Sequence, residues 1–205
     1  MKWIALLFVA GAAWADVVVV QRVEQGAQCT QVTLKLKGTK IRADIGPEIT
    51  LIMDTATGSA VTLRHSQKTA LLVTAAAARQ LMQKEPPSIS PTPKPTGRTA
   101  VIDGRETREF SSGKAAWWVA ARLAGGDPLG EMIDALEKTP MVKLADGLPG
   151  LGGEESLPGV PLRTEITTPG GRKITTSVVS AQEKPLEAID FEIPPGYRLL
   201  PAPVF

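Results

Sequence analysis

The residues best able to do acid–base chemistry stand in the stretch IMDTATGSAVTL, from Ile52 to Leu63. An Asp-Thr pair with a nearby Gly after apolar residues is the pattern of the aspartic-protease loop, and in those enzymes two carboxylates share one proton. That chemistry needs two such loops. Here Ala56 follows Asp54-Thr55, and no second Asp-Thr-Gly or Asp-Ser-Gly occurs. A hairpin turn is the favoured interpretation, and a hydrolase assembled from two subunits is the remote alternative.

Two further reactive side chains occur once each. His65 is the single histidine, so no metal site of several histidines can form, and we expect a structural residue at a sheet edge rather than a general base. Cys29 is the single cysteine and can form no disulfide within the chain. Its segment holds no histidine to activate it as a nucleophile. We therefore expect no catalytic residue, no metal and no cofactor.

The first fifteen residues, MKWIALLFVAGAAWA, have the pattern of a signal peptide. A cation precedes an apolar run, and small residues precede the expected cut between Ala15 and Asp16. No cysteine follows that cut, so a lipoprotein anchor is not expected. The sequence thus predicts an exported product, periplasmic or secreted, with residues 16–205 forming one domain.

The charge balance excludes some classes of partner. A formal net charge of +2 over 205 residues is far from the basic excess of a nucleic-acid-binding protein. Aromatic residues make up only 4% of the chain, which disfavours base-stacking surfaces and the aromatic girdles of an outer-membrane barrel.

Hairpin signals dominate the organisation of the chain. A two-residue turn at Gly38-Thr39 pairs Lys37 with Lys40 and sorts apolar from polar side chains along residues 30–45. This register predicts the pairs Leu36–Ile41, Leu34–Ala43, Val32–Ile45, Lys35–Arg42 and Thr33–Asp44. A three-residue loop ending at Gly58 predicts the pairs Met53–Val61, Leu51–Leu63 and Ile49–His65 in the next hairpin.

Later turns continue the pattern. Asp103-Gly104 is a type I′ hairpin signal. A turn over residues 169–171 predicts the pairs Ile166–Ile174 and Leu162–Val178. Together these segments indicate a mainly antiparallel β protein.

Two segments have helical character. Residues 74–85 are rich in alanine, and a proline-rich connector at residues 85–97 follows them. Residues 127–138 begin with Asp127 as N-cap and Pro128 in the first turn. Leu129, Met132, Ile133 and Leu136 then recur at helical spacing.

The order of these pieces resembles the LolA-like lipoprotein-carrier superfamily, and most closely a bacterial branch defined as a domain of unknown function. The segments KGTKIRAD, IMDTATGSAVTL with SQKTALLV, and FEIPPGYR carry the resemblance. It implies a strongly curved, open half-barrel sheet with two or three helices covering the concave face. It also implies that acyl chains bind between sheet and helices. No catalytic or lipoprotein-handling residues transfer with it.

Two sites are predicted on this frame. The first is an apolar lining for a lipid, an acyl chain or a lipidated protein, and a filled core without a cavity remains the alternative. Its candidate residues are Val32, Leu34, Leu36, Ile49, Leu51, Met53, Trp117, Leu129, Met132, Ile133 and Leu136. The second is a docking patch for anionic membrane headgroups, for which a solvated surface is the alternative. Its candidate residues are Lys35, Lys37, Lys40 and Arg42.

The predicted function is therefore a non-catalytic, exported binding module for an apolar or amphipathic ligand. A structural or interaction protein of the cell envelope, with a filled core, is the alternative. The sequence leaves the ligand, the partners and the oligomeric state open.

Overall fold

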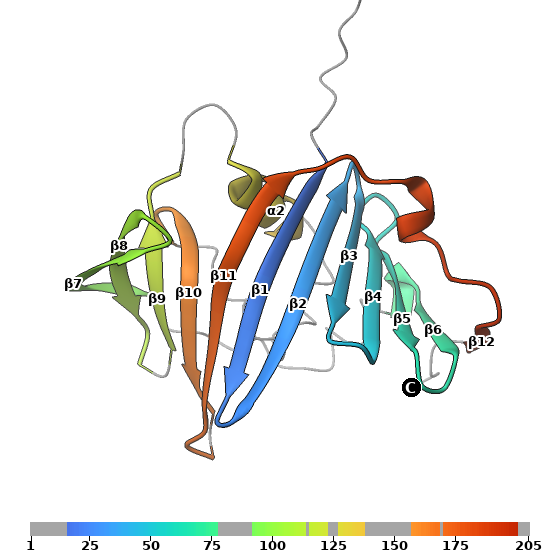
Figure 1. Cartoon of the computed structure of the whole chain (residues 1–205), viewed down its shortest axis with the longest axis horizontal. Helices are drawn as coiled ribbons and strands as arrows, with labels where there is room; N and C mark the ends of the chain where they lie inside the picture. The colour runs from blue at the N-terminus through green and yellow to red at the C-terminus, as the bar shows by residue number, and fades with distance from the viewer. Residues whose placement is uncertain are drawn as a thin grey trace, which may run out of the picture.

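The computed structural model describes residues 16–77, 92–113, 115–122, 127–137, 157–168 and 170–200. The described strands form one twelve-stranded sheet in the order β12-β6-β5-β4-β3-β2-β1-β11-β10-β9-β8-β7 (Figure 1). Every neighbouring pair is antiparallel except β12 and β6. The sheet is not closed, because β12 and β7 remain its two edges. The prediction of an open, mainly antiparallel sheet is confirmed.

Strands from the N-terminal region lie together on one side of the sheet order. Their bounds are β1 Val17–Gln25, β2 Gln28–Lys37, β3 Lys40–Ile45, β4 Ile49–Asp54, β5 Ser59–Arg64 and β6 Thr69–Val73. The later strands are β7 Lys94–Ile102, β8 Arg105–Ser111, β9 Ala115–Ala120, β10 Val160–Thr167, β11 Lys173–Glu183 and β12 Arg198–Leu200.

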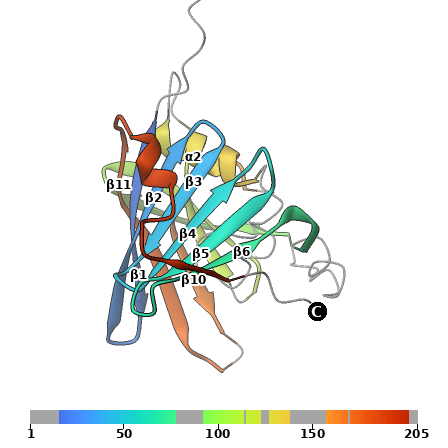
Figure 2. The same ribbon diagram turned by 90° about the vertical axis from the view of Figure 1, so that its right-hand side faces the viewer.

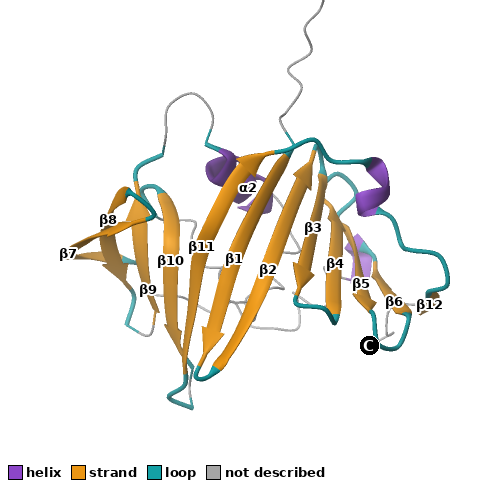
Figure 3. Ribbon diagram, in the orientation of Figure 1, coloured by secondary structure: helices purple, strands orange, loops and turns teal. Residues whose placement is uncertain are grey.

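Helices are few in the described part of the chain (Figure 3). The α-helix α2 spans Pro128–Glu137, and a 3-10 helix, η2, spans Ala188–Phe191. Of the first predicted helix, only residues 75–77 are described, and they are helical; residues 78–91, with most of the proline-rich connector, lie outside the described residues. No helix among the described residues has both the length and the apolar character needed to cross a membrane.

The two faces of the sheet carry different covers. Val17 and Val19 belong to a core cluster that includes the buried residues of α2. Val18 packs against a second cluster that includes Leu186 and Phe191. Because successive side chains of a strand point to opposite faces, α2 and the C-terminal segment lie on opposite sides of the sheet. Figure 2 shows the sheet from its side, with both elements in view. We call residues 186–200 the C-terminal strap, and the two surfaces the helix face and the strap face.

The hairpin registers test the sequence reasoning directly. The β2–β3 ladder has all six predicted pairs, from Lys37–Lys40 to Val32–Ile45. Asp103 and Gly104 both have positive φ, as the predicted type I′ turn requires. The pair Ile166–Ile174 is also present, but the β10–β11 ladder ends at Arg163–Ser177, one pair short of Leu162–Val178.

The predicted register of β4 with β5 is wrong by one residue. Met53 pairs with Ala60 rather than Val61, Leu51 with Thr62 rather than Leu63, and Ile49 with Arg64 rather than His65. The loop has four residues, because Asp54 pairs with Ser59 and the Gly58 amide donates to the Asp54 carbonyl. The shift puts Ile52 and Leu63 on the strap face, where they are core residues of the second cluster.

Candidate ligand site beneath α2

The helix α2 is built to lie on an apolar surface. The Glu131 amide donates to the carbonyl of Asp127, which starts the first helical turn. Arg105 donates to the Asp127 carboxylate at 3.3 Å, so β8 fixes the beginning of the helix. Arg122 makes an exposed ion pair with Asp134. The i, i+3, i+4, i+7 spacing then directs one stripe towards the sheet.

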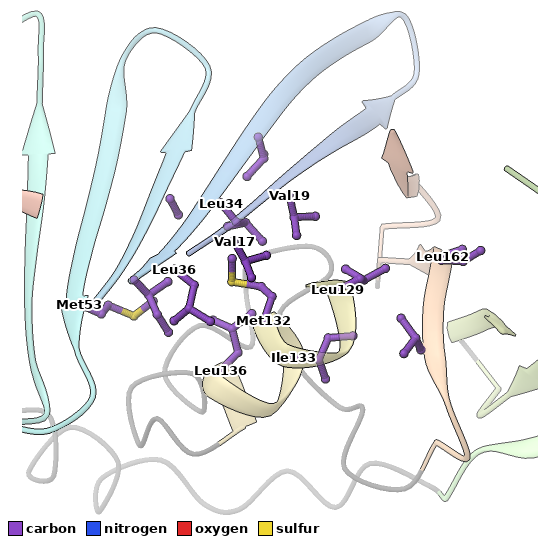
Figure 4. Close-up of a cluster of buried hydrophobic side chains, with 14 of the residues drawn as sticks. Val17, Val19, Leu34, Leu36, Met53, Leu129, Met132, Ile133, Leu136 and Leu162 are labelled. Carbon is purple, nitrogen blue, oxygen red and sulfur yellow. The ribbon is translucent and has the colours of Figure 1, made fainter. Parts of the chain in front are cut away.

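That stripe forms the centre of the core on the helix face (Figure 4). Its members Leu129, Met132, Ile133 and Leu136 are all buried, and Met132 is fully so. They meet the apolar side chains of β1 and β2, including Val17, Val19, Leu34 and Leu36. The helix also contacts β10 and β11. The contact with the sheet is thus made chiefly by apolar groups.

The structure gathers most of the predicted apolar lining in this cluster. Val32, Leu34, Leu36 and Met53 are buried members, as are the four residues of α2, and Leu51 packs against them half-buried. Two candidates lie elsewhere. Ile49 is 39% exposed, because it stands at the end of β4 beyond the helix. Trp117 is buried but belongs neither to the cluster nor to the cavity described next.

A small cavity lies between α2 and the sheet, with a volume of about 20 Å³. Its lining residues are Gln21, Leu34, Leu129, Met132, Ile133, Leu136, Pro161, Leu162, Arg163, Thr164, Thr176 and Val178. A cavity of this volume has room for about one water molecule. In this conformation, therefore, the helix and the sheet are in contact, and an acyl chain would need the helix to move.

The cavity wall has a polar part that our sequence reasoning missed. Gln21, Thr164 and Thr176 lie on three neighbouring strands and are 8%, 5% and 4% exposed. A signal was present in the alternation of Val17, Val19, Gln21 and Val23, which places a glutamine at a core-facing position of β1. For the threonines the signal was weaker, because threonine is common at exposed strand positions as well.

On the strap face, polar contacts fix the cover to the sheet. The Thr50 hydroxyl donates to the Asp44 carboxylate at 2.6 Å. The same oxygen must then accept from Nε2–H of His65 at 2.9 Å, which leaves Nδ1 to accept from the Tyr197 hydroxyl at 2.5 Å. His65 and Tyr197 also meet edge to face. The single histidine thus connects β4 to the strap, which agrees with a structural role.

The predicted docking cations take part in the same attachment. Lys35 pairs with Asp190 at 2.6 Å, Lys37 with Asp16 at 2.7 Å, and Arg42 with Asp44 at 2.8 Å. Arg42 also donates to the Asp190 carbonyl. Among the residues that the structure describes, Lys40 alone of the four has no ion pair. These contacts oppose the charge repulsion expected from their facing positions and involve three of the four in holding the chain together.

Two carboxylates of this attachment have shifted pKa values. Hydrogen bonds from Lys35 and from the Glu187 amide lower the pKa of Asp190 below its usual value, against the effect of burial. For Asp16, burial raises the pKa, but hydrogen bonds from Lys37 and the Leu186 amide outweigh it, so that the pKa is lowered. Both groups are therefore held as carboxylates. Asp16, the residue expected to follow the leader, thereby joins β1 to the start of the strap; residues 1–15 lie outside the described residues.

The stretch that suggested hydrolysis forms the tip of the β4–β5 hairpin. The Asp54 carboxylate accepts from the backbone amide of Ala56 at 2.9 Å, a bond within the turn. Gly58 has a φ of 65°, which favours glycine. The carboxylate therefore stabilises the turn. Within the described ranges, no group of three or more His, Cys, Asp or Glu side chains is arranged to hold a metal ion.

Comparisons with known proteins bear on the fold. No protein-family model and no curated protein matches the chain. An uncharacterized conserved protein from Thermus thermophilus is similar in structure, with a TM-score of 0.53 and 8% identity over 91% of this chain and 90% of that one. This similarity supports a shared fold over nearly the whole length of both chains.

Two further solved structures are more remote. The structure of PNGF-II gives a TM-score of 0.45 and 10% identity; the match covers 92% of this chain but only 31% of PNGF-II. A LolA superfamily protein from Nitrosomonas europaea gives a TM-score of 0.34 and 10% identity over 89% of this chain and 91% of that one. These two likenesses assign neither a family nor a function.

Proposed function

We propose that this protein is an exported, non-catalytic binding module that takes the apolar part of an amphipathic ligand between α2 and the sheet. The ligand class is a lipid, an acyl chain or a lipidated protein. The observation that carries the proposal is the attachment of α2, whose buried stripe of four apolar side chains lies over a small cavity on an open sheet.

Apolar contacts suit a cover that has to move. They are non-directional and nearly proportional to the area removed from water, at about 25 cal/mol per Å². An acyl chain that replaces the helix against Leu34, Leu162 and Val178 restores that burial, so exchange of one cover for the other costs little free energy. Met132 adds an adaptable side chain at the centre of the contact.

The described polar ties of α2 permit such a movement. The Arg105–Asp127 contact lies at the beginning of the helix, and the Arg122–Asp134 pair is largely exposed on both sides. An exposed ion pair contributes about 0–1 kcal/mol. The end of α2 that bears Leu136 can therefore move away from the sheet around the fixed beginning of the helix.

The alternative function is that of a structural or interaction protein of the cell envelope with a filled core. The volume of about 20 Å³ favours it, because packed interiors leave few voids larger than a water molecule. The two functions differ in one property, namely whether an apolar chain can enter beneath α2.

Titration of the delipidated protein with a fluorescent acyl probe separates the two functions. We expect saturable binding by the original protein and altered affinity in Met132→Ala, which removes a fully buried side chain facing the sheet. Val179→Ala is the matched control, because it shortens an apolar side chain that is exposed on β11. Absence of probe binding, together with absence of co-purified lipid in native mass spectrometry, would establish the filled-core alternative.

A further inference from the structure

We infer that the cavity beneath α2 contains a subsite for one uncharged oxygen-bearing group, so that the preferred ligand is an alkyl ester or alkanol rather than a free carboxylate or a plain alkane. The inference rests on the proposed function and specifies the chemistry of that same site. Its basis is the polar part of the cavity wall, formed by Gln21, Thr164 and Thr176.

The three side chains are close neighbours in the sheet. Thr164 of β10 is directly opposite Thr176 of β11. On the other side of β11, Gln21 of β1 is paired with Val178, two residues from Thr176 and on the same face. Two hydroxyls and one amide thus border one cavity whose remaining lining is largely apolar.

None of the three makes a side-chain hydrogen bond within the described part of the chain, although each is more than nine-tenths buried. Their polar atoms are also not sealed from the cavity, since the fully enclosed side-chain atoms without a partner are Trp117 Nε1 and Arg163 Nε. A buried hydroxyl or amide without a partner costs about 1–3 kcal/mol. Three together are best explained by a partner that enters the cavity.

The strands are locally reshaped at this level. The β1–β11 ladder skips Val179, between the pairs Val20–Ser180 and Gln21–Val178. The β9–β10 ladder skips Leu162, between the pairs Val119–Pro161 and Trp118–Arg163. Bulges re-aim side chains and recur beside binding sites. Here two of them, on adjacent strands, flank the polar wall.

The chemistry of the wall favours a neutral group. Hydroxyl and amide groups both donate and accept, so they satisfy an ester carbonyl or an alcohol equally well. The one charged lining residue, Arg163, is next to Thr164 on its strand and so projects to the opposite side. Its guanidinium stacks over Trp118 and donates to Glu165 at 2.6 Å. A carboxylate in the cavity would therefore lack a cation and would be costly to bury.

The test compares four probes of one chain length on the delipidated mature chain: an alkanol, a methyl ester, a free fatty acid and an alkane, each displacing a fluorescent acyl probe. We expect the alkanol and the ester to bind roughly tenfold more tightly than the alkane, because two hydrogen bonds are gained. The isosteric double change Thr164→Val with Thr176→Val should remove this preference and leave alkane binding intact. It should not lower the thermal midpoint, because it removes two unpaired hydroxyls.

A matched control and three results decide the outcome. Thr33→Val, on β2 and outside the cavity, should leave all affinities unchanged. Equal affinity for all four probes would overturn the subsite, with a bound water then satisfying the three side chains, and would leave the proposed function standing. Tightest binding of the fatty acid would also overturn it. Failure of every probe to bind would overturn the proposed function and the subsite together.

Discussion

The helix α2 and the C-terminal strap cover opposite faces of one sheet, and they are held there by different forces. Four apolar side chains hold α2, over a cavity with an unsatisfied polar wall. The strap adds to its apolar anchor, Phe191, the Lys35–Asp190 ion pair, the His65–Tyr197 hydrogen bond and a parallel strand pairing at β12. Directional polar contacts specify one position, whereas apolar contacts tolerate several. The difference indicates a fixed cover on one face and a displaceable cover on the other.

The largest effect is expected from removing the apolar anchor of the strap. Phe191→Ala should lower the free energy of unfolding by about 3–5 kcal/mol, because the buried ring leaves a cavity. Urea unfolding measures this loss. Ile189→Ala, at a position 68% exposed in the same 3-10 helix, is the matched control and should change stability by less than about 0.5 kcal/mol. Equal effects at the two positions would mean that the strap does not pack as a fixed cover.

Acid should weaken the attachment of the strap. The folded pKa values of Asp16 and Asp190 are lowered from the ordinary value of 3.8. Their contribution to stability is therefore complete above about pH 5 and is lost as the pH falls through 3.8 towards the folded values. Unfolding curves recorded across this range should show a steeper acid decline for the original protein than for the pair of changes Asp16→Asn and Asp190→Asn. Identical acid slopes would remove these carboxylates from the account.

A smaller effect is expected at the histidine. Tyr197→Phe keeps the edge-to-face ring contact but removes the hydroxyl that donates to His65. The loss should be about 0.5–1.5 kcal/mol, the usual net value of one hydrogen bond. Thermal unfolding measures it, and affinity for an acyl probe should not change, because the strap is on the face away from α2. A change in probe affinity without a change in stability would contradict the division between the two covers.

The outcome of the sequence reasoning follows the same division. The β2–β3 register was predictable because two signals agreed, namely the Gly38-Thr39 turn and the sorting of side chains to two faces. The β4–β5 register was not. Ile52 and Leu63 are apolar residues of the strap face, so the rule that apolar residues share one face selected the wrong pairs.

What covers a face is harder to read from sequence than the face itself. The His65–Tyr197 contact joins residues 132 positions apart, and Asp190 meets Lys35 across 155 positions. Such pairs leave no local periodicity to detect. The stripe of α2 was predictable because its spacing is local, whereas the cavity depends on bulges in β10 and β11 that no turn residue announces.

Hydrogen exchange of the backbone amides, with and without a bound alkyl ester, tests the difference between the covers most directly. The account predicts that amides of α2 exchange through local openings of lower free energy than those of the strap. The ester should slow α2 and leave the strap amides, including Arg198 bonded to Lys68, unchanged. Equal protection of both elements at the free energy of global unfolding, unaffected by the ester, would contradict the claim that α2 is the displaceable cover.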